Sequence, residues 1–240
     1  MWHMTTKRIL VLANSTKHHP KSCIAGRELL NEGGDKTKWG AWIRPVSNHD
    51  EGALDFVERR LADGKDPKPL DVMQLPLSGP ENNPLQPENW LIQVGQPWIK
   101  ESSLAPQVLP SLVEEPDDLW LQPGQKSDRA NPAFLQHLSN LQSLYLVRPE
   151  SFRFEIRSTT WESRAKKQLR GPFKYKRHHY GFTLTDPLIS RKYFPVFRQS
   201  AEGYSKPNDA SQILLCISLT PPFKDGLHYK VIATVFELPA

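Results

Sequence analysis

The sequence predicts an all-β protein with a few short helices, divided into two domains with the same order of elements. Three observations lead to this fold class. Twenty-two prolines and thirteen glycines interrupt the chain too often for long helices. Short runs rich in Val, Ile, Leu and aromatic residues recur between these breaks, as is typical of strands. The succession of three strands, a helix and two strands can be read once in each half of the 240 residues.

The first half contains five strand-like runs and one helical signal. The strands are expected at residues 7–13, 22–28, 39–46, 71–77 and 90–94. A helix is expected between the third and fourth runs, where apolar residues recur at helical spacing: Leu54, Phe56, Val57 and Leu61. Asn48 or Asp50 is the expected N-cap, and Asp63-Gly64 the expected end.

The second half repeats this order after a stretch rich in proline and acidic residues. Its strands are expected at residues 144–157, with a bend at 148–149, and at 171–176, 179–185, 213–219 and 229–237, with a short helix at 187–193. We therefore divide the chain into a first barrel at 5–100, a Pro-rich acidic connection at 101–140 and a second barrel at 141–240.

A five-stranded barrel with a helix between its third and fourth strands is the layout of the OB-fold. The predicted architecture is therefore two OB-fold-like five-stranded barrels in tandem. An SH3-like barrel or a β-sandwich would produce similar runs, and no sequence repeat joins the halves, so the doubling rests on element order. OB barrels bind oligonucleotides or oligosaccharides on strands two and three and on the loops beside them.

The positive charge of the chain is concentrated in one segment. The whole chain carries +5, whereas residues 151–180 contain nine Lys or Arg against Glu155 and Glu162, which gives +7 there and −2 elsewhere. The nine are Arg153, Arg157, Arg164, Lys166, Lys167, Arg170, Lys174, Lys176 and Arg177. Such a basic excess within a slightly acidic chain favours a polyanion footprint over general solubility.

The stretch FKYKRHHYGFTLTDP at 173–187 is predicted to be a hairpin. Phe173 and Tyr175 share one strand face, and Tyr180, Phe182 and Leu184 share another, so the parity changes between the two groups. A turn or a bulge must lie there, which puts residues 176–178 near the tip.

The preceding segment, residues 159–171, is expected to be a short helix or a loop. Thr159 and Glu162 have the spacing of a capping box, and Trp161, Ala165 and Leu169 fall on one helical stripe. The other face of that helix would be basic. In either form, this connection would place its cations beside the usual OB ligand face.

Cations along a backbone and aromatic rings that stack on bases are the means by which proteins hold single-stranded nucleic acid. The candidate nucleic-acid-binding residues are Arg44, Arg157, Trp161, Arg164, Lys166, Lys167, Arg170, Lys174, Tyr175, Lys176, Arg177, His178 and His179. Two plainer interpretations stay open: the aromatic rings belong to the core, and the cations decorate a solvated hairpin. For Arg44, a phosphate contact and a structural ion pair fit the sequence equally.

Other chemistries find no support in the residue pattern. Cys23 lies near His18 and His19, but no carboxylate or amide partner is signalled, so a buried strand explains this cysteine better than a nucleophile. With Cys216, the two cysteines are too few for a disulfide framework, and no metal-ligand spacing or phosphate-binding loop occurs. We therefore predict no enzyme activity, no metal site and no cofactor.

The chain is expected to be cytoplasmic and not associated with a membrane. No run approaches the roughly 18 apolar residues of a membrane helix, and the N-terminus lacks a basic segment followed by an apolar one. The opening residues MWHM look like an added leader and are left out of the fold reasoning.

Several segments resemble the bacterial dual OB-containing domain family. They are RILVLANSTKHHPKSCIAGREL, WGAWIRPVS, DPKPLDVMQLPL, YGFTLTDP and CISLTPPFKDGLHYKVIATVF, so the resemblance runs from about Lys7 to Glu237. None of them is a catalytic motif, and no catalytic residue carries over. The resemblance implies two OB barrels and a role in nucleic-acid recognition in bacterial conflict or phage defence.

Together these observations predict a non-enzymatic module that binds DNA or RNA, single-stranded or locally opened, as a recognition component of a bacterial defence system. Two alternatives stay open. The chain is a sensor of a nucleotide or modified base on the same face, or an adaptor for a larger defence enzyme. The adaptor would use an acidic segment with two apolar residues: Glu114, Glu115, Asp117, Asp118, Leu119 and Trp120.

Overall fold

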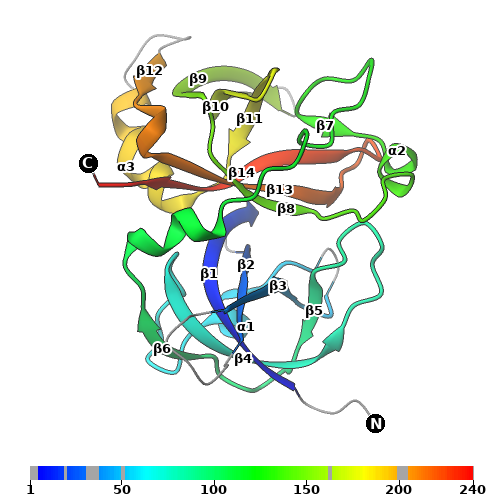
Figure 1. Ribbon diagram of the computed structural model, residues 1–240, viewed down its shortest axis with the longest axis vertical. Helices are drawn as coiled ribbons and strands as arrows, with labels where there is room; N and C mark the ends of the chain where they lie inside the picture. Colours follow the sequence, from blue (N-terminus) through cyan, green and yellow to red (C-terminus); the bar gives the residue numbers. More distant parts are fainter. Residues whose placement is uncertain are drawn as a thin grey trace. The chain divides into compact units, whose positions relative to one another are not determined.

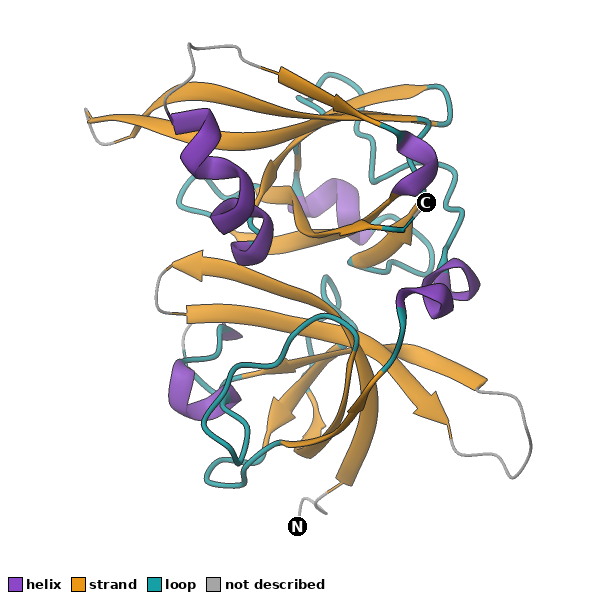
Figure 2. Cartoon of the chain, turned by 90° about the vertical axis from the view of Figure 1, so that its left-hand side faces the viewer, coloured by secondary structure: helices purple, strands orange, loops and turns teal. Residues whose placement is uncertain are grey.

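The fold consists of two units, each built mainly of strands (Figure 2). The computed structural model describes residues 5–18, 21–30, 38–49, 52–161, 164–198 and 205–239. The first unit comprises residues 1–112 and 140–143, and the second comprises 113–139 and 144–240. The chain therefore passes between the units three times, at 112/113, 139/140 and 143/144. The stretch 101–140, expected to be a separate connection, is divided between both units.

The first unit is a closed OB barrel (Figure 1). Its strands are β1 (Thr5–His18), β2 (Lys21–Leu30), β3 (Lys38–Val46), β4 (Asp71–Pro80), β5 (Asn89–Ile92) and β6 (Ile99–Ser103). They are ordered β1-β2-β3-β5-β4, and β1 also pairs with β4, which closes the barrel. The pair β3–β5 is parallel and the others are antiparallel. All five predicted strands are present, and β6 adds to the edge of β4.

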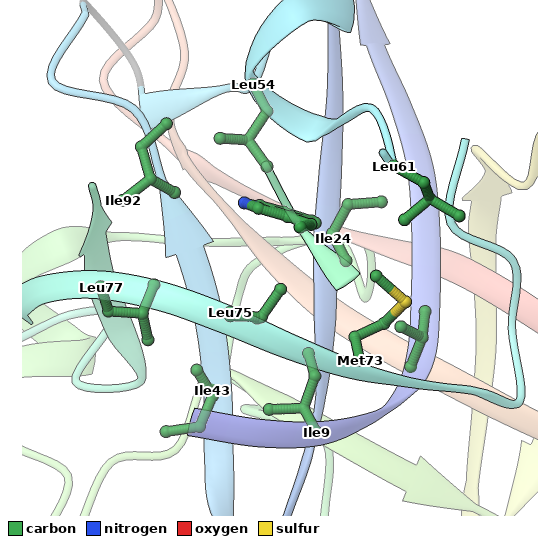
Figure 3. Packing of buried hydrophobic residues seen from close by; sticks show 11 residues of the cluster. Ile9, Ile24, Ile43, Leu54, Leu61, Met73, Leu75, Leu77 and Ile92 are labelled. Carbon is green, nitrogen blue, oxygen red and sulfur yellow. The ribbon is translucent and has the colours of Figure 1, made fainter. Parts of the chain in front are cut away.

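Strand alternation builds the core of this unit. On β4, Met73, Leu75 and Leu77 point to one side, and all three are fully buried. The side chains of the cluster converge on one another (Figure 3). They are Ile9, Val11, Ile24, Ile43, Leu54, Leu61, Met73, Leu75, Leu77, Ile92 and Trp98.

Two short helices complete the first unit, α1 (Phe56–Arg59) and the 3-10 helix η2 (Pro106–Leu112). Helix α1 lies between β3 and β4 as predicted, but the predicted N-cap is wrong. Asp55 caps the helix: its carboxylate accepts a hydrogen bond from the Glu58 N–H at 2.9 Å, and the Glu58 carboxylate accepts one from the Asp55 N–H at 2.9 Å. This reciprocal capping box satisfies two amides that no earlier residue reaches.

The second unit repeats the strand order of the first. Its strands are β7 (Arg129–Ala130), β8 (Leu144–Val147), β9 (Ser151–Trp161), β10 (Arg164–Tyr175), β11 (His178–Leu184), β12 (Ser205–Asn208), β13 (Ile213–Pro222) and β14 (His228–Glu237). The order β9-β10-β11-β14-β13 matches β1-β2-β3-β5-β4, and β11–β14 is parallel, as β3–β5 is. Here β12 pairs with β9, and the chain continues from β12 through residues 209–212 into β13. This segment therefore links the first and last strands of the five-strand order. The fold class is therefore two OB barrels in tandem, as predicted.

The helices of the second unit are α2 (Pro132–Gln136), α3 (Pro187–Arg198) and the 3-10 helix η3 (Ala210–Gln212). Helix α3 lies between β11 and β13, where the OB layout requires it and where a helix was predicted. The predicted bent strand at 144–157 is two strands, β8 and β9, because the chain breaks at 148–150 around Pro149.

The expectation of a short helix or a loop at 159–171 is wrong. Strand β9 continues to Trp161, and β10 begins at Arg164, with these two residues paired across the hairpin. Two adjacent threonines and a tryptophan favour strand over helix, and a helix of about ten residues is marginal without packing. Residue Glu162, the other half of the expected capping box, lies outside the described residues.

The predicted hairpin at 173–187 is confirmed. Tyr175 pairs with His178, so residues 176–177 form the turn, and Lys176 has a left-handed backbone with φ of 50°. Both parity groups face inward: Phe173, Tyr175, Tyr180, Phe182 and Leu184 are all buried.

Candidate nucleic-acid interface

The outer surface of β9, β10 and β11 carries three of the predicted cations, Arg157, Arg170 and Lys174. On β9, Phe152, Phe154 and Ile156 are buried, so the intervening Arg153 and Arg157 point outward and are exposed. The residues of this surface, named here the basic face, are Arg153, Glu155 and Arg157 on β9, Gln168, Arg170, Pro172 and Lys174 on β10, and His179, Gly181 and Thr183 on β11. Strands β9, β10 and β11 are the first, second and third strands of this barrel. The usual OB ligand face lies on the second and third strands.

The equivalent surface of the first unit is closed. On β3, Ile43 belongs to the core cluster, so Trp42 and Arg44 belong to the opposite side. Both are nevertheless buried, and Arg44 donates a hydrogen bond from Nη1 to Asn89 Oδ1 at 3.1 Å. Arg44 is therefore a structural side chain, and one of its partners is an amide oxygen.

Carboxylates of the second unit neutralise part of the basic face. Glu155 lies between Arg157, which donates to it, and Arg153, whose nitrogen is 3.5 Å away. Lys174 pairs with Glu150 at 2.5 Å. The Lys174–Glu150 pair is largely exposed and is worth about 0–1 kcal/mol, so another anion can replace it at low cost. Glu155 is buried, although both arginines that it pairs with are exposed. The face is positive, but its net charge is smaller than the number of Lys and Arg residues in these strands indicates.

The pair between Arg170 and Asp128 is less exposed. Arg170 Nη2 donates to Asp128 Oδ2 at 2.9 Å, and Arg170 also donates to the Gly181 carbonyl. Burial alone would raise the pKa of Asp128, but hydrogen bonds from Arg170 and Arg129 hold that pKa below its usual value. Arg129 in turn lies over the Tyr229 ring, 4.9 Å from its centroid. Arg170 is thus fixed in orientation at the edge of the face.

The centre of the basic face is flat because two small residues meet there. Gly181 pairs with Pro172 across β10 and β11. A Cβ atom added at Gly181 would meet no atom within 4 Å. This leaves open space between the side chains of Arg170 and Lys174, which lie two positions to either side of Pro172.

The hairpin tip holds the next group of predicted residues. Arg177 is exposed, and Lys176 reaches the Asp117 carboxylate at 3.3 Å and the Glu115 carbonyl at 3.2 Å. His179 is exposed opposite Lys174, and His178 is half-buried. Of these two imidazoles, His179 belongs to the basic face.

Tyr175 lies in the core instead of on the surface expected for base stacking. Its ring is buried and its hydroxyl donates to the Pro116 carbonyl at 2.8 Å. Burial, together with nearby Glu115, raises the pKa of this hydroxyl. Tyr180, also considered for stacking, is buried as well, and its hydroxyl accepts a hydrogen bond from the Leu119 N–H at 3.2 Å.

Three further predicted residues are described only through their backbone. Arg164 pairs with Trp161, and Lys166 pairs with Thr159. The side chains at these positions lie outside the described part of the structure. Lys167, half-buried, pairs with Ser158 on β9.

The acidic segment at 113–121 belongs to the second unit and is anchored in it. Leu119 is fully buried and Trp120 is 3% exposed. The Trp120 carbonyl accepts a hydrogen bond at 2.8 Å from Lys230 Nζ, a buried lysine whose pKa is lowered to about 8 by desolvation. The adaptor hypothesis expected Leu119 and Trp120 to engage a partner, and this part is wrong because both side chains fill the unit itself.

Two features of the face escaped the sequence analysis. Arg153 was counted in the basic segment but not selected, although it shares the strand parity of Arg157 and could have been found that way. Arg129 had no such signal, because its approach to Asp128 and Tyr229 depends on the pairing of β7 with β14.

Comparison with known proteins decides the family. Residues 7–235 match the family model of the dual OB-containing domain. The chain belongs to this family. The match covers both units of this dual OB-containing domain, and so confirms the resemblance noted in the sequence. A search of curated proteins finds no match.

Solved structures similar to this dual OB-containing domain include two HIN domains. One is the tetrameric p202 HIN2, with a TM-score of 0.34 and 10% identity over 99% of this chain and 94% of that one. The other is the p204 HINb domain, with a TM-score of 0.33 and 10% identity over 98% and 97%. Similarity at this level says nothing about function.

Two searches within the structure give negative results. Among the residues that the structure describes, no group of three or more His, Cys, Asp or Glu side chains is placed to hold a metal ion. No helix in the described ranges is long and apolar enough to cross a membrane.

Proposed function

We propose that this dual OB-containing domain is a non-enzymatic module that binds nucleic acid through the basic face of its second unit. One observation carries the proposal: outward-pointing cations gather on the first two strands of an OB barrel, beside an open space over Gly181 on the third. The ligand is DNA or RNA that is single-stranded or locally opened. Its biological setting, under this proposal, is recognition in the cytoplasm by a bacterial defence system.

The ion pairs of the face are compatible with phosphate binding. Arg153 and Arg157 share the single carboxylate of Glu155. Each guanidinium has five N–H donors in a planar fork, so one shared carboxylate uses only part of them. The remaining donors suit the bidentate recognition of a phosphate. Under this proposal, Glu155 orients the two arginines and leaves donors of both available to a phosphate.

Base contacts would come from the tip and from the flat centre. His179 is exposed beside Lys174, and base–aromatic stacking is worth about 1–3 kcal/mol per base. The open space over Gly181 allows a base or a sugar to approach the strand backbone closely. This is why Gly181 is the position for a blocking substitution.

Fluorescence anisotropy with labelled single- and double-stranded DNA and RNA at two ionic strengths tests the proposal. The variant Arg153→Gln/Arg157→Gln/Lys174→Gln should weaken binding at least about tenfold. It should also flatten the salt dependence, by about 0.7 in log–log slope for each lost contact on a single strand.

A matched control is Arg8→Gln in the first unit, since Arg8 is also a surface arginine paired with a glutamate, Glu101, at 2.6 Å. It should bind as the unmodified chain does. Equal affinity of the triple variant and this control would overturn the basic face as the site. No binding to any nucleic acid would overturn the function.

A second candidate function rests on the acidic segment. Glu115 and Asp117 are exposed beside the buried anchor at Leu119 and Trp120, so the segment presents carboxylates from a fixed backbone. An adaptor would use these carboxylates to meet a basic surface of a larger protein. Glu115→Gln/Asp117→Asn should then abolish capture of that partner and leave nucleic-acid affinity unchanged or higher. The sensor alternative uses the basic face itself and is tested by calorimetric titration with mononucleotides.

A further inference from the structure

The hairpin formed by β9 and β10 is longer than the barrel requires. Strand β12 pairs with β9 only over residues 152–155, and β11 pairs with β10 only over 170–175. Beyond these, residues 157–161 and 164–168 have strand partners only in each other, within the part of the chain that the structure describes. These ten residues, named here the β-ribbon, run from the pair Arg157–Gln168 to the pair Trp161–Arg164.

The β-ribbon is solvated on both sides at its base. Arg157 and Ser158 are consecutive in β9 and therefore belong to opposite faces, yet both are exposed. Ile156 and Leu169, one pair earlier, are buried. Pairing with the other strands of the sheet thus ends at this point, and the hairpin continues as two strands.

The composition of the β-ribbon points to a polyanion. It contains four cations, Arg157, Arg164, Lys166 and Lys167, and the two residues between its strands add one carboxylate, Glu162. Residues 157–168 therefore carry a net charge of +3. Charge on a free two-stranded β-edge also protects it from aggregation.

The dimensions of the β-ribbon select among polyanions. Five paired positions at about 3.3 Å per residue give a length of about 17 Å. The major groove of B-form DNA is about 12 Å wide and admits a two-stranded ribbon, with phosphates along both rims. The major groove of A-form RNA is deep and too narrow for side chains to read. A single strand offers no groove at all.

We infer that the β-ribbon enters the major groove of duplex DNA. This inference rests on the proposed function and extends it, because the basic face binds a single strand and the β-ribbon binds an adjoining duplex. The ligand class is then DNA with a junction between double- and single-stranded parts. The ribbon cations contact the phosphates on the rims of the groove.

Shortening the ribbon isolates its contribution. Replacing residues 158–167 with Asn-Gly joins the paired residues Arg157 and Gln168 through a two-residue turn of the preferred kind and leaves the barrel strands intact. A second variant, Lys166→Gln/Lys167→Gln, keeps the ribbon and the cations of the basic face and removes ribbon charge, in case the shortened chain does not fold. The control is Ser158→Ala, which changes the ribbon without changing charge.

The affinities are measured for single-stranded DNA, duplex DNA, duplex RNA of the same sequence and a DNA junction. Shortening should reduce duplex and junction affinity at least about tenfold, since each lost phosphate contact on B-DNA removes about 0.9 from the salt slope. Single-strand affinity should change by less than about twofold, because the basic face supplies those contacts. Methyl green, which occupies the major groove, should compete, and netropsin, which occupies the minor groove, should not.

The outcomes separate the two proposals. Duplex affinity that survives shortening, or equal affinity for duplex RNA and duplex DNA, would overturn the ribbon inference and leave the basic face standing. A chain that binds no nucleic acid of any kind would overturn both. Selective loss of duplex and junction binding would support both.

Discussion

Two glycines on neighbouring strands should respond in opposite ways to the same substitution. Gly171 on β10 pairs with Phe182, and Gly181 on β11 pairs with Pro172, so the two positions are adjacent pairs of one hairpin. They differ in the face they belong to. Gly171 lies on the core side and Gly181 on the basic face.

The surroundings give the magnitudes. A Cβ atom at Gly171 would lie 2.5 Å from Ile232 Cδ1, 2.8 Å from Phe152 Cε2 and 3.1 Å from Leu184 Cδ1. Overpacking of this kind costs about 1–3 kcal/mol of unfolding free energy. At Gly181 a Cβ meets nothing, so Gly181→Ala should be neutral or stabilise by about 0.5–1 kcal/mol, because alanine loses less backbone entropy on folding.

Urea unfolding followed by circular dichroism and tryptophan fluorescence measures both variants. The expected difference between them is about 1–4 kcal/mol, from the two ranges taken together. If Gly171→Ala were as stable as Gly181→Ala, the assignment of faces on β10 and β11 would be refuted, and the basic face with it. Gly181→Glu extends the test to function, since it should fold normally and still bind nucleic acid more weakly.

Three further predictions concern side chains of the second unit. For the buried Lys230, the folded pKa of about 8 lies below the unfolded value near 10.5, so the unfolded chain binds more protons between these pH values. Its stability relative to Lys230→Met should therefore rise by up to about 3 kcal/mol from pH 8 to 10.5 in urea titrations. A constant difference between the two proteins would contradict the desolvation of Lys230. Lys176 has a positive φ, so Lys176→Gly should be at least as stable as the parent and Lys176→Val less stable by about 1–2 kcal/mol in thermal unfolding. Loss of the exposed Asp117 contact should contribute under about 1 kcal/mol to either change. A Val variant as stable as the parent would exclude the left-handed turn. Asp128→Asn should raise nucleic-acid affinity, because it frees Arg170, and should lower stability by about 1–3 kcal/mol. Anisotropy and unfolding are measured on the same samples, and an unchanged affinity would contradict this prediction.

Much of the fold could be predicted because the strands are short and clearly bounded. Runs such as 71–77 and 213–219 lie between Pro, Gly and Asp residues, and each became a strand a few residues longer than expected. The parity argument at 173–184 also held, because strand alternation depends only on local geometry.

The expected structure of residues 159–171 was wrong because local signals were misleading there. Its capping-box spacing and apolar stripe are local signals for a helix, but pairing between β9 and β10 satisfies the backbone of both strands and prevailed.

The candidate site was predicted in part for similar reasons. The segment that carries the cations was evident from its composition, whereas the carboxylates that meet them were not. Asp128 lies 42 residues from Arg170 and Asp117 lies 59 from Lys176, in a stretch that read as a surface connection. Parity placed Tyr175 correctly beside Phe173, but only the structure shows that this shared face is the core.

The three passages of the chain between the units affect how the molecule responds to cleavage. Residues 140–143 return to the first unit, where the Glu88 carboxylate accepts hydrogen bonds from the Ser143 N–H at 2.5 Å and from its hydroxyl at 2.8 Å. A protease that cuts at 112/113 leaves 1–112 and 113–240 as separate chains, and residues 140–143 then hold to the first unit only through non-covalent contacts such as those with Glu88. Neither half can therefore be released or expressed alone by choosing a single end point, and gene-splitting experiments need breaks on both sides of this short return.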